Sequence, residues 1–119
     1  MSSLLLLIVF SGLCGIGDAL GFIHAARVWR RGEFSWVEAL KSAAGFQFGI
    51  AMYWLALREL TAMGVLSAEA QTLVWFVATI IGVAALSGQF LRWPVAEQLV
   101  AGAVLAGLCW LLLRTEGGA

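Results

Sequence analysis

One acidic side chain, Asp18, stands in the middle of a long apolar and glycine-rich stretch, GLCGIGDALGFIHAARVWRR. A charged side chain at the centre of a lipid bilayer costs about 2.5–3.5 kcal/mol on insertion scales. Such a carboxyl group is expected to hold a proton, to pair with a cation, or to face a water-filled cavity. Each of these makes Asp18 a candidate site for binding a proton or a cation.

Small residues surround Asp18 at helical spacing. Cys14, Gly15, Gly21 and Ala25 fall three, four or seven positions from it, so they share one face of a helix with the acid. Small side chains on that face let a second helix approach closely, or leave room for a ligand beside the carboxylate. The alternative is structural: Asp18 forms a hydrogen bond with a neighbouring helix and fixes how the helices pack.

Two further polar side chains, Gln47 and Glu69, are candidate members of a proton or substrate site. Gln47 lies in the middle of a second apolar stretch, where it could form a hydrogen bond across helices. Glu69 lies about one turn into a third stretch and could act as a gate or a second ligand group. Its alternative role is that of an interfacial acid near a helix N-terminus, where the helix dipole favours negative charge.

The chain that must position these groups has 119 residues, of which 62% are hydrophobic and 12% are charged. Soluble domains are about 45–50% apolar and about 25% charged, so the expected solvent of this chain is lipid. Its net charge is zero, which gives no electrostatic reason to expect a nucleic-acid partner. The two cysteines and one histidine lack the spacing of metal ligands. With no nucleophile motif or phosphate-binding loop either, we expect no metal, no cofactor and no enzyme activity.

Four stretches approach the length of about 20 apolar residues that a helix needs to cross a bilayer. They cover about residues 4–28, 37–57, 66–90 and 95–113, and short connections join them. Backbone polar groups in lipid must find their partners within their own segment, which favours helices. The sequence therefore predicts an all-α membrane protein, a single four-helix transmembrane bundle over residues 1–119.

Pairs of small residues four apart predict where helices could cross closely. Gly45 and Gly49 form such a pair in the second stretch, and Gly102 and Ala106 form one in the fourth. Gly21 would serve the same purpose in the first. The sequence predicts these five positions as helix-packing residues.

The basic residues are distributed unequally between the two ends of the predicted bundle. Five fall on one side and two on the other; they are Arg27, Arg30, Arg31, Lys41 and Arg92 against Arg58 and Arg114. The side richer in Lys and Arg is cytoplasmic by the positive-inside rule, so both termini are predicted to face outside. Of the tryptophans, Trp54 and Trp75 lie deeper than the others and are expected to pack between helices.

The chain resembles the small multidrug resistance proteins of the drug/metabolite transporter superfamily. The resemblance lies in the first-helix acid and in the segments GFQFGIAMYWLALREL, ATIIGVAALSGQFLRWP and QLVAGAVLAGLCWLLL. In that family the acid follows a small residue and precedes a glycine by three positions, as Gly17, Asp18 and Gly21 do here. The resemblance implies that Asp18 binds protons and substrate in competition. It also implies a dimer in a bacterial inner membrane.

The chain departs from this family at the start of the third helix. There the drug exporters carry aromatic residues that sandwich a hydrophobic cation, whereas this chain has Ser67, Glu69 and Ala70. The resemblance leads us to expect a proton-coupled transporter or flippase protomer for a small cation, a metabolite or a polyprenyl-linked substrate. The alternative is a non-transporting structural or accessory subunit of a larger membrane complex.

The unequal charges bear on the expected partner. Members of the resembling family pair antiparallel, which requires almost no charge bias between the two sides. The five-to-two bias favours one fixed orientation instead. We expect a homodimer, or a heterodimer with a related small membrane protein.

Overall fold

The computed structural model describes residues 2–117, with side chains to Arg114. The helices are α1 (Ser3–Ala25), α2 (Trp36–Ala62), α3 (Ala68–Ser87), α4 (Val95–Gly117) and a short 3-10 helix η1 (Phe90–Arg92). Two short strands, β1 (Trp29–Arg30) and β2 (Glu33–Phe34), connect α1 to α2. The prediction of a helical chain is confirmed, with this small hairpin as an addition.

Three of the four long helices have the length and apolar composition needed to cross a membrane. They are α1, α3 and the part of α4 from Val95 to Arg114. The described residues of α2 do not reach the same apolar content, although α2 is the longest helix. Gln47 lies in its middle, and Lys41, Arg58 and Glu59 lie near its ends. Membrane integration is thus supported by three helices.

Local side-chain chemistry explains where the helices begin and end. Ser2, Ser35 and Ser67 stand at the N-caps of α1, α2 and α3, and each hydroxyl accepts a hydrogen bond from a first-turn N–H at 3.2–3.4 Å. Gly88 ends α3 in the left-handed conformation, with a φ of 72°. α1 ends at Ala25, earlier than the predicted residue 28, because the chain turns there into the hairpin.

The hairpin follows from a turn of two residues with positive φ. Arg31 has a φ of 53° and Gly32 a φ of 79°, the combination that a two-residue turn needs to match the twist of its strands. Arg30 lies opposite Glu33 across the antiparallel pair. This hairpin was not predicted from the sequence because strands of two residues are too short to show an alternating pattern.

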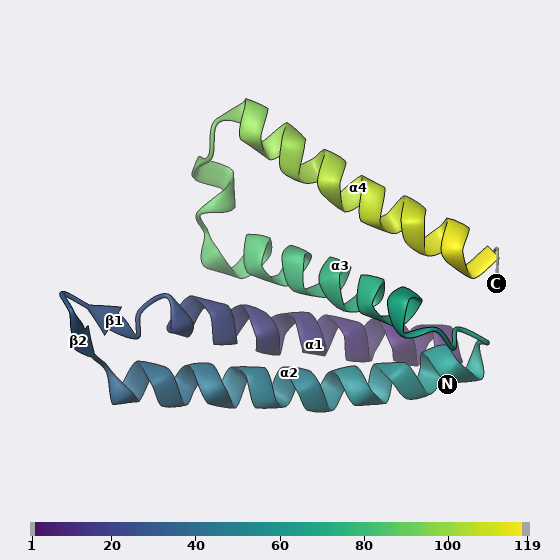
Figure 1. The fold of residues 1–119 in the computed structure, drawn as a ribbon, viewed down its shortest axis with the longest axis horizontal. Helices are drawn as coiled ribbons and strands as arrows, with labels where there is room; N and C mark the ends of the chain where they lie inside the picture. Colours follow the sequence, from purple (N-terminus) through teal and green to yellow (C-terminus); the bar gives the residue numbers. More distant parts are fainter. Residues whose placement is uncertain (1, 118–119) are drawn as a thin grey trace.

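α1 is the central helix of the fold. Figure 1 shows α2 running antiparallel along one side of α1 and α3 packing against α1 from above. α2 and α3 scarcely touch each other. The start of α1 and the end of α4 lie at one end of the molecule, and the hairpin and η1 lie at the other (Figure 1).

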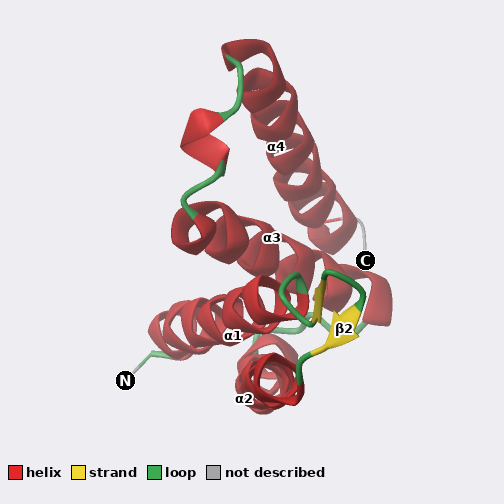
Figure 2. Ribbon diagram, turned by 90° about the vertical axis from the view of Figure 1, so that its left-hand side faces the viewer, coloured by secondary structure: helices red, strands yellow, loops and turns green. Residues whose placement is uncertain are grey.

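α4 stands apart from this three-helix core (Figure 2). It packs mainly against α3, and near its far end Leu112 reaches a small core of Leu60, Val65 and Ala70. None of the described residues of its apolar window is buried. The four helices are therefore present, but only three of them pack together closely.

Candidate functional site

Asp18 lies where α1, α2 and α3 meet, and its side chain is only 2% exposed. The Thr79 hydroxyl of α3 donates a hydrogen bond to Asp18 Oδ2 at 3.0 Å. The Cys14 thiol, one turn earlier on α1, donates to the same oxygen at 3.5 Å. The other oxygen, Oδ1, faces the backbone of Gly49 on α2 so closely that a methyl group at Gly49 would overlap it. Groups from three helices thus enclose the carboxyl group.

The partners of Asp18 within the described residues are neutral. The two ion pairs in that part of the chain are His24–Glu38 and Arg58–Glu59, and neither includes Asp18. Pairing with a cation, the second of the three expectations for an intramembrane acid, is therefore not how the described residues accommodate this carboxyl group.

Glycines on α1 and α2 make the close approach beside Asp18 possible. A methyl group at Gly45 would lie 2.7 Å from the Gly21 nitrogen and 2.9 Å from the Gly17 oxygen. These are backbone atoms that cannot turn aside. The buried Ser42 hydroxyl adds a hydrogen bond to the Gly21 carbonyl at 2.8 Å. The predicted packing positions Gly21, Gly45 and Gly49 all lie in this α1–α2 contact.

A second close contact joins α1 to α3 on the other side of Asp18. A methyl group at Gly15 would lie 2.5 Å from the Ala78 carbonyl oxygen. Gly82 approaches the Gly15 carbonyl at least as closely. Asp18 therefore lies between two glycine-mediated crossings, which hold its surroundings at fixed distances.

The fourth-helix pair, Gly102 and Ala106, lies in different surroundings. Both residues are exposed, and a methyl group at Gly102 would meet nothing within 4 Å. Small residues alone do not specify a neighbour, because an apolar helix surface in lipid can face another helix or the lipid itself. Within the described chain this pair makes no helix crossing.

The structure does not bring Gln47 or Glu69 to Asp18. Gln47 is exposed, and it lies two positions from both Gly45 and Gly49, which face α1. Two positions are about 200° around a helix, so Gln47 is on the opposite side of α2. Glu69 is exposed in the first turn of α3, about 15 Å along that helix from Thr79. Asp18, Gln47 and Glu69, each a candidate for binding a proton or substrate, therefore lie apart from one another.

The polar groups that do reach Asp18 were not singled out in the sequence as its partners. Thr79 carries the hydroxyl group within the apolar segment ATIIG, at a depth on α3 comparable to that of Asp18 on α1. This similar depth is the one feature of the sequence that could have identified Thr79 as a partner of Asp18. Cys14 was noted only as a small residue on the same helical face as Asp18. Its spacing of four residues is the one at which helical side chains meet.

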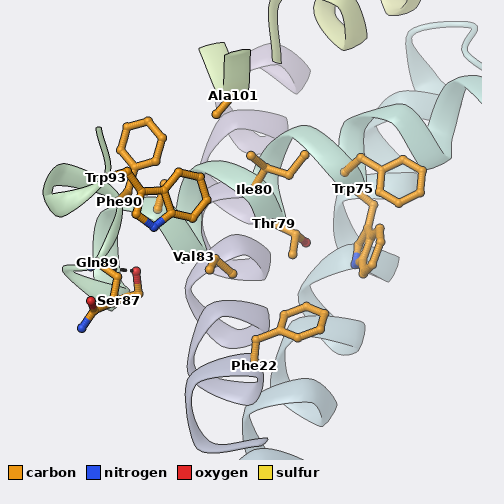
Figure 3. A pocket seen from close by; sticks show the side chains of 12 residues that line it. Phe22, Trp75, Thr79, Ile80, Val83, Ser87, Gln89, Phe90, Trp93 and Ala101 are labelled. Atoms are coloured by element: carbon orange, nitrogen blue, oxygen red, sulfur yellow. Dashed lines mark hydrogen bonds between the residues drawn. The ribbon is translucent and has the colours of Figure 1, made fainter. Parts of the chain in front are cut away.

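Thr79 also lines a cavity of about 440 Å³ (Figure 3). Its wall is formed largely by aromatic and aliphatic side chains from the end of α1, from α3 between Trp75 and Ser87, from η1 and its flanking residues, and from α4. They include Phe22, Trp75, Phe76, Phe90, Trp93 and Ala101. Trp75, expected to pack between helices, lines this cavity, whereas Trp54 is 63% exposed. Thr79 stands between the cavity and Asp18, because it lines the former and donates its hydroxyl to the latter.

Within the described residues, no group of three or more His, Cys, Asp or Glu side chains is placed to hold a metal ion. Comparisons of the chain with protein-family models, with curated proteins and with solved structures find no match. Fold and site together define a helical protein with three candidate membrane-spanning helices and a buried carboxyl group between α1, α2 and α3.

Proposed function

We propose that this chain is an integral membrane protein in which Asp18 has a structural role, and that it serves as a non-transporting structural or accessory subunit of a larger membrane complex. The observation that carries this proposal is the enclosure of Asp18. A carrier must exchange the proton or cation on its acid with water. Here the carboxyl group is 2% exposed and already held by Thr79 and Cys14.

The energetics fit a role in helix specificity. Hydrogen bonds between membrane helices contribute about 0.6 kcal/mol on average and at most about 1.7 kcal/mol. One such bond between Thr79 and Asp18 adds little to the total stability. It does select one rotation of α1 relative to α3, because a different register would leave a carboxyl group unpaired in an apolar contact.

α4 is the element that such a subunit would present to its surroundings. Its apolar window has no buried residue and it packs mainly against α3, so most of its surface is free to contact lipid or a neighbouring subunit. Five basic residues lie at or near the hairpin and η1 end, and two lie toward the other. We place the hairpin end in the cytoplasm and both termini outside. The bacterial inner membrane is the compartment that the resemblance suggests.

The cavity beside Thr79 supports a second candidate function. In this proposal the chain is a proton-coupled transporter or flippase protomer for a small cation, a metabolite or a polyprenyl-linked substrate. It would act as a homodimer or with a related small membrane protein. A cation in the cavity would lie against the aromatic rings of Trp75 and Phe76, which attract positive charge. Rotation of the Thr79 hydroxyl would then open the way to Asp18.

A proton-release measurement separates the two candidates. The purified chain in weakly buffered micelles is mixed with tetraphenylphosphonium, a hydrophobic cation, and the pH is followed. The structural role predicts no proton release from the wild type. It also predicts that Asp18→Asn, which can still accept from Thr79, unfolds within about 1 kcal/mol of the wild type. Release of a proton by the wild type but not by Asp18→Asn would overturn the structural role and support the carrier.

A pair of matched substitutions tests the structural contact itself. Thr79→Val keeps the side-chain shape and removes the hydroxyl, so it should lower the free energy of unfolding by about 1–2 kcal/mol. Thr72→Val is the control, because the exposed Thr72 hydroxyl donates a hydrogen bond to the Ala68 carbonyl of its own helix and not to Asp18. Equal effects of the two substitutions would contradict a special role for the Thr79–Asp18 bond.

A further inference from the structure

The connection between α1 and α2 carries a group of exposed aromatic side chains that contact one another. The Trp29 and Phe34 rings lie 5.2 Å apart at 70°, and the Phe34 and Trp36 rings lie 4.9 Å apart at 76°, both edge-to-face. The Ser35 N–H bonds to the Val28 carbonyl at 2.8 Å and closes the loop behind them. Trp29 is nevertheless 67% exposed and Trp36 71% exposed. The rings are ordered by one another while remaining open to their surroundings.

Four exposed cations lie in the same segment of the chain as these rings. They are Arg27, Arg30, Arg31 and Lys41. Neither ion pair found among the described residues uses any of the four. Two acids lie nearby, but Glu33 faces Arg30 across the hairpin and Glu38 is bound to His24 at 2.7 Å. The segment 27–41 therefore has a surplus of positive charge.

The position of this segment fixes which surface it meets. The candidate span α1 ends at Ala25, so Arg27 and Trp29 follow within one turn of the end of an apolar helix. That is the depth of the lipid headgroups, where Trp rings are enriched. Arg31 and Gly32 form the turn of the hairpin, so Arg31 lies at its tip.

We infer that this hairpin patch, the exposed aromatic and basic side chains of residues 27–41, binds the phosphate-bearing headgroups of anionic phospholipids in the leaflet at that end of the molecule. The rings sit among the headgroups, and the guanidinium groups pair with phosphate oxygens in the planar geometry that Arg favours. The cations and the negative leaflet are complementary in charge. The inference holds for either candidate function, because it depends only on α1 crossing the membrane.

Native mass spectrometry of the full chain in mild detergent tests this inference. The protein is equilibrated with equal amounts of phosphatidylglycerol and phosphatidylcholine, and the retained lipid is counted. We expect the wild type to retain phosphatidylglycerol with a preference of about tenfold or more. The combined change Arg27→Gln, Arg30→Gln and Arg31→Gln should reduce it to about twofold or less. Arg114→Gln, at the opposite end on α4, should leave it unchanged.

Three results would overturn the inference. One is an unchanged preference in the triple variant, and another is an equal loss in Arg114→Gln. The third is displacement of phosphatidylglycerol by inorganic phosphate at equal concentration, which would indicate a free-anion site. Should the triple variant misfold by circular dichroism, Arg30→Gln alone decides: the preference should fall by at least about twofold, and no change would count against the patch.

Discussion

The close crossing of α1 and α2 can be tested with a single methyl group, by the substitution Gly45→Ala. The added carbon would lie 2.7 Å from the Gly21 nitrogen, 2.9 Å from the Gly17 oxygen and 3.1 Å from the Gly21 Cα. All three are backbone atoms of α1, so no side chain can rotate to make room. The two helices must therefore move apart along the segment that encloses Asp18.

The size of the effect follows from two opposing contributions. Overpacking of this kind costs about 1–3 kcal/mol, and sometimes more. Alanine gains up to about 1 kcal/mol over glycine in helix propensity, which offsets part of that cost. We expect Gly45→Ala to lower the free energy of unfolding by about 1–2 kcal/mol, which is a factor of about 5–30 in the folding equilibrium.

The matched control is Gly102→Ala, a change of the same chemistry on α4. A methyl group there meets nothing within 4 Å, so only the propensity gain applies, and the variant should be neutral or up to about 1 kcal/mol more stable. The free energies of unfolding of both variants can be measured by reversible unfolding in mixed micelles with increasing dodecyl sulfate, followed by circular dichroism. Equal shifts for Gly45→Ala and Gly102→Ala would refute the argument that α1 and α2 are in backbone contact.

Other features of the structure lead to three further predictions. The hydrogen bond from His24 holds the pKa of Glu38 below its usual value of 4.5, so the stability from this pair is present above pH 4.5 and is lost as the pH falls through the lower folded value. The unfolding free-energy difference between the wild type and Glu38→Gln should therefore shrink at acidic pH; a pH-independent difference would contradict it. Mass spectrometry should show Cys14 reacting with a maleimide only after unfolding, and early labelling of Cys14 would mean that the α1 contact opens. Gly32→Ala should cost about 1 kcal/mol at a φ of 79° and speed hydrogen exchange of the hairpin amides, whereas unchanged exchange would argue against the turn.

The sequence was sufficient to predict the helices and to single out Asp18 as an acid within an apolar stretch, since both depend on local composition. Long apolar stretches specify helices in lipid wherever they occur. A lone acid in such a stretch needs an explanation, whatever its neighbours are. The partner of Asp18 could not be identified in the same way, because its pairing with Thr79 depends on the rotation of α3 against α1.

Two other outcomes show where sequence patterns reach their limit. That Gln47 faces away from α1 could have been predicted from the sequence. A residue midway between Gly45 and Gly49 cannot share the helix face on which those glycines contact another helix. The separation of α4 from the other three helices could not have been predicted from the sequence. In lipid, an apolar helix gains little from choosing a protein neighbour over a lipid tail, so its sequence carries little information about its place.

The central position of α1 has a consequence for how the molecule is assembled. Because α2 and α3 scarcely touch each other, each relies on α1 as its docking partner. α1 is also the earliest of these helices along the chain, and during synthesis N-terminal segments become available before later ones. The order of the chain thus lets α2 and α3 each find α1 already in place as they are made. Without α1, neither α2 nor α3 would have the helix against which it packs.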